Sequence, residues 1–159
     1  MKQMLAGLIA MFLLSSCASS SSDQIYLQRA NCRISASVTK DAEGHKLGMV
    51  FENRADKIVR VQNPMCLNQN VILTVRSDSG EEETQQIAVS SDNCGEYFTL
   101  NPGESRTFSI PYTLEALFGL KTPGTYKVNF EYVGGLYEDN GSMYGDQILK
   151  SPVEEFALK

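Results

Sequence analysis

This 159-residue chain contains four cysteines and a single histidine, residue types that often serve as nucleophiles, bases or transition-metal ligands. Nucleophilic catalysis needs a base held against a nucleophile and oriented by a third group. A zinc site needs three or four His, Cys or carboxylate ligands. His45 lies in the polar stretch 41–45 with no companion motif, so we expect a solvated turn residue. The sequence predicts no enzyme, no metal site and no cofactor.

Two acidic stretches have oxygen atoms that could bind a cation. Glu81-Glu82-Glu83 is expected to be a solvated hairpin tip, with cation binding as the alternative. Glu138-Asp139-Asn140-Gly141 lacks the alternating spacing with which a calcium loop directs every second side chain at one ion. Neither stretch is therefore predicted to be a metal site.

Cys17 has surroundings that suggest acylation after export. Lys2 precedes an apolar stretch, 4–14, of about 11 residues, the size of a signal-peptide core and well short of a membrane span. The stretch ends in Leu14-Ser15-Ser16-Cys17, which resembles the lipobox of bacterial lipoproteins. The resemblance implies cleavage before Cys17 and a lipid on its thiol. The alternative is an ordinary secretory signal in which Cys17 is incidental.

This resemblance also implies how the chain is organised. A signal peptide (1–16) is followed by the lipidated cysteine with a serine-rich tether (17–24) and then by one domain (25–159). A polar tether of this composition buries too little apolar surface to fold. Two or more acyl chains hold a protein durably on a membrane. Because Ala18 follows the cysteine, we expect an outer-membrane anchor and a domain that faces the periplasm.

The remaining cysteines are Cys32, Cys66 and Cys94, an odd number that allows at most one internal disulfide in an oxidising compartment. Suppose that segments 69–76 and 84–89 pair as a hairpin around a turn near residue 80. The residue numbers of any two facing residues then add to about 160. The numbers of Cys66 and Cys94 also add to 160, so these two cysteines are expected to face each other. We therefore predict a Cys66–Cys94 disulfide and a buried Cys32. In the alternative, Cys32 pairs with one of the other two.

Alternation of apolar and polar residues predicts that the elements positioning these groups are strands. The apolar faces are Cys32/Ile34/Ala36/Val38, Leu47/Met49/Phe51, Val59/Val61, Val71/Leu73/Val75, Phe108/Ile110, Tyr126/Val128/Phe130/Tyr132 and Phe156/Leu158. Pro102-Gly103 and Pro123-Gly124 each suit a type II turn. A short helical turn is expected near 113–120, with Leu117 to Leu120 in the core. The predicted fold is an all-β, antiparallel immunoglobulin-like sandwich of about seven to nine strands.

A family resemblance covers residues 47–133. It is carried by 47–53 with Asp56-Lys57, by Leu100-Asn101-Pro102-Gly103-Glu104 before Phe108, and by Gly124-Thr125-Tyr126-Lys127-Val128. These stretches are similar to the immunoglobulin-like domain of bacterial intracellular proteinase inhibitors and to the propeptide domain of deuterolysin-like metallopeptidases. The resemblance implies the fold. No inhibitory residue of that family can be matched to a position of this sequence.

The segment 134–147 is the longest stretch outside the predicted strands. A loop of this length is uncommon without a role, and tyrosine favours recognition surfaces. We predict a partner-binding loop that exposes Tyr137, Met143 and Tyr144. The alternative is a long hairpin whose aromatic side chains fold back onto the sandwich.

The charge of the chain restricts its partners. Its formal net charge is −5, and removal of Lys2 with the signal peptide makes it −6, which gives no electrostatic reason to bind nucleic acid. The leading hypothesis is a lipoprotein that binds another protein, as an inhibitor of a protease or as a toxin-immunity protein. The alternative is a structural or accessory lipoprotein of an envelope assembly or secretion machine.

Overall fold

A computed structural model of the chain describes residues 30–89, 92–144 and 147–159. The predicted signal peptide, Cys17, the tether and the predicted start of the domain at Ile25 lie outside these residues. Within them, no helix combines the length and apolar character needed to cross a membrane.

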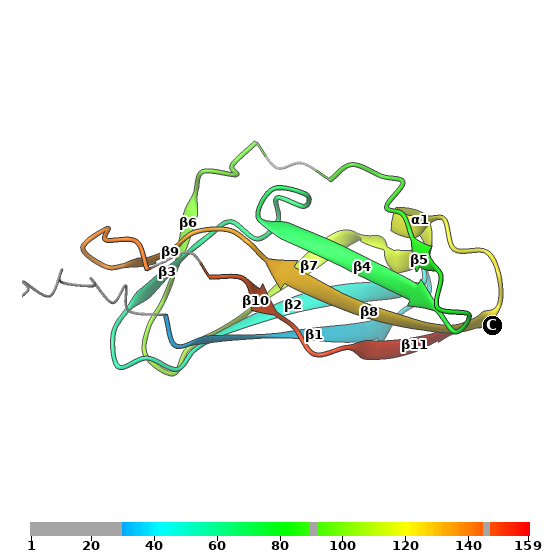
Figure 1. Ribbon diagram of the computed structural model, residues 1–159, viewed down its shortest axis with the longest axis horizontal. Helices are drawn as coiled ribbons and strands as arrows, with labels where there is room; N and C mark the ends of the chain where they lie inside the picture. The colour runs from blue at the N-terminus through cyan, green and yellow to red at the C-terminus, as the bar shows by residue number, and fades with distance from the viewer. Residues whose placement is uncertain (1–29, 90–91, 145–146) are drawn as a thin grey trace, which may run out of the picture.

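The described residues form eleven strands and one short helix (Figure 1). In chain order these are β1 (Cys32–Lys40), β2 (His45–Asn53), β3 (Val59–Gln62), β4 (Val71–Ser77), β5 (Glu82–Glu83), β6 (Tyr97–Leu100), β7 (Ser105–Thr113), α1 (Leu114–Phe118), β8 (Gly124–Tyr132), β9 (Leu136–Glu138), β10 (Leu149–Lys150) and β11 (Glu154–Leu158). The strand count exceeds the predicted seven to nine. β6, β9 and β10 lie where no strand was predicted, and β5 lies just before the predicted strand segment 84–89, which does not form a strand.

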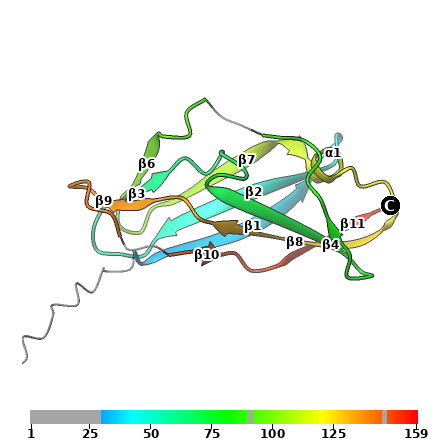
Figure 2. The same ribbon diagram turned by 45° about the horizontal axis from the view of Figure 1, so that its top comes forward.

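Three antiparallel sheets make up the fold. β1-β2-β7 form one layer, and β4, β5, β8, β10 and β11 form the layer that faces it (Figures 1 and 2). A third, smaller sheet, β6-β3-β9, extends one end of the sandwich. The predicted all-β, antiparallel sandwich is confirmed.

The core lies between the two large sheets, where the predicted alternation places the apolar side chains. β8 buries Tyr126, Val128, Phe130 and Tyr132 and exposes or half-exposes the residues between them. Phe51 of β2 stands at the centre, with its ring centroid 5.0 Å from that of Tyr132 and 5.7 Å from that of Phe108. Edge-to-face aromatic packing of this kind adds to the hydrophobic free energy of burial.

The short helix and one of the two predicted turns follow their sequence signals. The Thr113 hydroxyl caps α1 by accepting the Ala116 N–H at 3.1 Å, and Gly119 ends the helix in the left-handed region, with φ of 69°. Leu117 and Phe118 lie in the core, as predicted. Gly103 has φ of 77°, as a type II turn requires.

The prediction of a second type II turn at Pro123-Gly124 is wrong. Gly124 has no positive φ, because it is already the first residue of β8 and pairs with Leu158 of β11. The extended backbone of a paired strand is incompatible with the left-handed conformation of that turn.

The Cys66–Cys94 disulfide is confirmed, with a Cα–Cα distance of 5.5 Å, but the hairpin used to predict it is wrong. β4 pairs with β5 at only two positions, and the chain then leaves the sheet: the Gln86 N–H donates to the Leu117 carbonyl at 2.8 Å. The disulfide therefore closes a long loop, part of which leaves the sheet. Closing a loop of this length stabilises the fold by about 3.5 kcal/mol in the chain-entropy model.

Cys32 is buried and takes no part in a disulfide. Its side chain shares the inner face of β1 with Ile34 and Ala36, as predicted. Burial raises the pKa of the Cys32 thiol to about 11, so the thiol stays protonated and unreactive at neutral pH.

The prediction that His45 is a solvated turn residue is wrong. His45 is the first residue of β2, is 5% exposed, and places Nδ1 2.6 Å from Oε1 of Glu115 in α1. The same carboxylate accepts the His45 backbone N–H at 3.0 Å. The turn before β2 is tight, because the Asp41 N–H donates to the Gly44 carbonyl. The strand therefore begins at His45 itself, which places this residue against α1.

The His45–Glu115 contact makes stability depend on pH in the acidic range. Desolvation raises the pKa of Glu115, but its hydrogen bonds from His45 outweigh that effect and hold the pKa below its ordinary value. A carboxyl group with a lowered folded-state pKa stabilises the fold above its unfolded pKa of about 4.3. That stabilisation disappears as pH falls through the lower, folded-state pKa.

We expect Glu115→Gln to cost about 1–2 kcal/mol at pH 7, because a charge-assisted hydrogen bond is lost. The variant should also lose less stability than the unmodified chain between about pH 5 and pH 3. Urea unfolding across this pH range measures both effects, with Glu81→Gln at an exposed turn as control. Identical pH profiles for Glu115→Gln and the unmodified chain would show that the pair does not stabilise the fold.

Candidate functional site

Three connecting segments meet at one end of the sandwich: 54–58 before β3, the turn 101–104 before β7, and the segment from 133 after β8. Figure 1 shows them at the end away from the C-terminus and α1, beside the first residues of β1. Immunoglobulin-like domains that recognise partners through loops use segments gathered in this way at one end of the sandwich.

Asn53, the last residue of β2, connects two of these segments. Its side chain is completely buried. Nδ2 donates to the carbonyls of Lys57 at 2.8 Å and Leu100 at 2.9 Å, and Oδ1 accepts the Ala55 N–H at 2.9 Å. Its backbone N–H and carbonyl bond to residues 103–104 of the turn. One amide therefore fixes both the 54–58 segment and the 101–104 turn.

Tyr132, the last residue of β8, fixes the third segment. Its hydroxyl, on a fully buried side chain, bonds to the carbonyls of Gln62 at 3.0 Å and Gly135 at 2.9 Å. Burial raises the pKa of Tyr132, so the phenol remains a neutral donor. The Gln62 side chain extends the connection, because it accepts the Gly135 N–H at 2.9 Å and donates to the Cys94 carbonyl at 3.1 Å.

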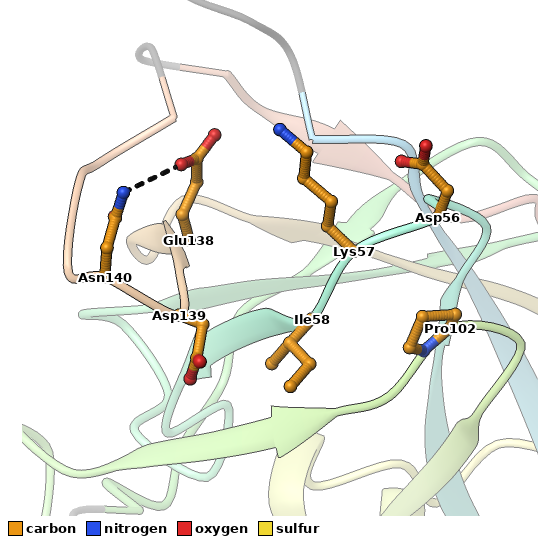
Figure 3. Close-up of a pocket in the computed structure, with 7 residues that line it drawn as sticks. All are labelled: Asp56, Lys57, Ile58, Pro102, Glu138, Asp139 and Asn140. Carbon is orange, nitrogen blue, oxygen red and sulfur yellow. Dashed lines mark hydrogen bonds between the residues drawn. The ribbon is translucent and has the colours of Figure 1, made fainter.

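A pocket of about 440 Å³ lies between these segments (Figure 3). Its lining residues are Asp56, Lys57, Ile58, Pro102, Glu138, Asp139 and Asn140. In Figure 3 the Lys57 ammonium and the Asp56 and Glu138 carboxylates lie along one side, and Ile58 lies across from them. With three carboxylates and one ammonium, the pocket favours a basic or hydrogen-bond-donating group over an anion.

Asn140 donates to the Glu138 carboxylate at 3.2 Å across the pocket wall. This contact belongs to the turn 138–142, in which the Glu138 N–H donates to the Ser142 carbonyl. In the described part of the chain, no three His, Cys, Asp or Glu residues are grouped so that they could hold a metal ion.

Beside the pocket, the outer face of the β6-β3-β9 sheet has a surface that we call the Tyr–Arg surface: Arg60, Tyr97, Tyr137 and Met143. The Tyr97 and Tyr137 rings pack edge to face at 4.9 Å between centroids, and the Arg60 guanidinium lies 5.1 Å above the Tyr97 ring. A hydrogen bond with Tyr97 raises the pKa of Tyr137. Met143 forms an isolated antiparallel β-bridge with Tyr137, and Met143 is 47% exposed.

The three predicted partner-binding residues do not all lie on one surface. Tyr137 and Met143 lie next to each other on the Tyr–Arg surface. The predicted exposure of Tyr144 is wrong: it is 5% exposed, and its N–H donates to the Leu136 carbonyl at 2.9 Å. Residues 136–144 form a hairpin, so alternation along its return segment turns Met143 outward and Tyr144 into the core.

Arg60 and Tyr97 were not identified from the sequence. Arg60 lies between Val59 and Val61, and this alternation could have placed it on the outer face. Tyr97 had no such signal, because the pairing of β6 with β3 joins segments more than thirty residues apart.

Comparison with known proteins adds little. No protein-family model and no curated protein matches the chain. A solved structure, Northeast Structural Genomics Consortium target SoR45, has a TM-score of 0.45 at 8% identity, over 82% of this chain and 88% of the other. β-Glucosidase 3B from Thermotoga neapolitana, in complex with α-D-glucose, has a TM-score of 0.31 at 15% identity, over 81% of this chain and 17% of the other. Both likenesses are too distant to bear on function.

We expect Asn53→Ala to destabilise the protein by about 2–4 kcal/mol, because it leaves two buried carbonyls and one N–H without their partner. Asn140→Ala, at an exposed turn of the same end, is the matched control and should cost less than about 1 kcal/mol. Urea unfolding followed by circular dichroism measures both. Equal costs would mean that Asn53 does not organise this end.

Proposed function

We propose that this chain is a lipid-anchored periplasmic lipoprotein whose domain binds another protein, with the Tyr–Arg surface as its contact. The observation that carries the proposal is the composition of that surface. Tyrosine, arginine and methionine are enriched at protein interfaces, and tyrosine and arginine at the positions that contribute most binding free energy. Here two tyrosines, an arginine and a methionine are adjacent and partly exposed on one sheet face.

The rigidity of the supporting end favours this role. Asn53 and Tyr132 hold the three connecting segments through hydrogen bonds between buried groups. A surface that is ordered before it meets its partner loses less conformational entropy on binding. The pocket next to it has three carboxylates and one ammonium among its lining side chains, so it can take one basic side chain of the partner.

Anchoring at the outer membrane through Cys17 is the second part of the proposal, and the lipobox-like sequence supports it. Ala30 follows Cys17 by 13 positions, so the anchor and the first described residue can be about 45 Å apart at most. β1 begins at the end of the sandwich where β3 and β9 lie (Figure 1). A partner would therefore be met close to the membrane.

Two versions of the binding role follow from the sequence. Inhibition of a protease, or neutralisation of a toxin, is supported by the resemblance of residues 47–133 to the inhibitor domain. An accessory role in an envelope assembly or secretion machine is the alternative, and a surface fixed near the membrane suits it equally. We propose no catalytic role, since the single histidine is buried against Glu115 and the unpaired Cys32 thiol is protonated.

We expect Cys17→Ser to abolish lipid attachment and to move the protein from the membrane pellet to the soluble fraction. The test is metabolic labelling with a radioactive fatty acid, followed by fractionation of the envelope; Cys32→Ser is the matched control. A Cys17→Ser protein that is still labelled and sediments with membranes would contradict the lipid anchor.

For the binding role, we expect a photo-crosslinking amino acid at position 137 or 143 to give a discrete crosslinked species in the cells that make the protein. The same amino acid at position 72 is the control, because Ile72 on β4 is 43% exposed, close to the 47% of Met143, and lies on a different sheet. Crosslinks of equal yield from all three positions, or from none, would refute a specific contact at the Tyr–Arg surface.

A further inference from the structure

One edge of the small sheet has no partner among the strands that the structure describes. The strand order is β6-β3-β9, so β6 pairs on one side only. The Asn63 N–H donates to the Glu96 carbonyl, which sets the alternation of the β3–β6 ladder. Phe98 and Leu100 then bond to β3, whereas Tyr97 and Thr99 direct their backbone N–H and carbonyl groups away from it.

This edge lacks three of the features that commonly prevent strand addition. Natural edges are commonly protected by lysine, proline or a bulge, and β6 (Tyr97–Leu100) has none of these. β7, one of the two edge strands of the first large sheet, does contain Pro111. Phe98 remains half-buried on the inner face of β6, so an added strand would also cover apolar surface.

Two arginines flank β6, one on each face. Arg60 lies over the ring of Tyr97, and the Arg106 guanidinium lies 4.5 Å from the ring centroid of Phe98, whose side chain points to the opposite face. None of the ion pairs within the described ranges involves either arginine. An arginine stacked on an aromatic ring keeps its N–H donors available to a carboxylate.

We propose that the free edge of β6 is the docking site for an extended, acidic segment of the partner, which adds to the sheet as a further strand. Backbone bonds to Tyr97 and Thr99 would hold the segment, and carboxylates on its two faces would pair with Arg60 and Arg106. This inference rests on the proposed binding role and specifies the chemistry of the partner.

A second copy of the chain fits the edge less well. Two β6 strands placed edge to edge would bring the arginines of one copy near those of the other, and like charges at close range disfavour pairing. An acidic segment instead complements two guanidiniums on a chain whose net charge is −5.

The test uses fluorescence anisotropy with the full lipidated chain in detergent micelles. The probe is a labelled octapeptide in which valine and glutamate alternate in pairs, Val-Glu-Glu-Val-Val-Glu-Glu-Val, so that an extended strand carries carboxylates on both faces. Its control replaces glutamate with lysine. We expect the glutamate peptide to bind at least about tenfold more tightly than the lysine peptide, which corresponds to about 1.4 kcal/mol. Equal affinities, or no binding of either peptide, would overturn the proposal.

Thr99→Pro tests the backbone contribution. The Thr99 N–H faces away from β3, so proline removes the outward donor without removing a bond of the β3–β6 ladder. Affinity for the glutamate peptide should fall at least about tenfold. The matched control is Ser109→Pro, at an exposed position of the free β7 edge, and it should bind as the unmodified chain does. A Thr99→Pro protein that folds and binds normally would overturn the inference.

Charge reversal provides a second variant that does not depend on proline being accommodated. Arg60→Glu with Arg106→Glu should make the chain prefer the lysine peptide. An unchanged preference for glutamate would overturn the proposed role of the arginines. A dimer of the unmodified chain that Thr99→Pro dissociates would assign the edge to a second copy and also overturn it.

These outcomes are separable from failure of the proposed function. If crosslinks from positions 137 and 143 persist in the Thr99→Pro chain, the protein binds a partner but not through the β6 edge. If the unmodified chain gives no crosslinks from those positions, the binding role itself fails.

Discussion

Asn53 is completely buried, and its side-chain amide bonds to three backbone groups in two different segments. A buried amide that has lost its hydration must find such partners, or the fold loses stability. Tyr132 meets the same constraint for the third segment, since its hydroxyl reaches carbonyls on β3 and at the start of the 135–144 region. The shape of this end therefore follows from satisfying two buried polar side chains.

The surface features depend on this arrangement. Tyr137 can pack on Tyr97 only because β9 and β6 both pair with β3, and β3 is held to β8 by the Tyr132 hydroxyl. The pocket has its walls in the 54–58 segment, the 101–104 turn and the 138–142 turn, and two of these three walls bond to Asn53. Stability at this end and the proposed recognition thus share the same hydrogen bonds.

The sequence predicted the fold well and the site only in part, and the difference follows from the range of the contacts. Alternation along β8 is local, so its inner face could be predicted residue by residue. His45 was misinterpreted because its partner, Glu115, is 70 positions away. The Cys66–Cys94 pair was predicted correctly from a hairpin that in the structure has only two paired positions, since the chain after β5 turns to bond with Leu117 of α1. Tyr97 and Arg60 become a surface only through β3–β6 pairing, which no local pattern indicates.

Native-state amide hydrogen exchange tests most directly whether this end is held rigid before any partner binds. The Ala55 and Gly103 amides bond to Asn53, and the Gly135 amide bonds to Gln62. A preformed site predicts that these three amides exchange as slowly as those at the ends of the paired strands β2 and β8. Exchange as fast as that of residues in the exposed turn around Gly80 would contradict a preorganised binding end.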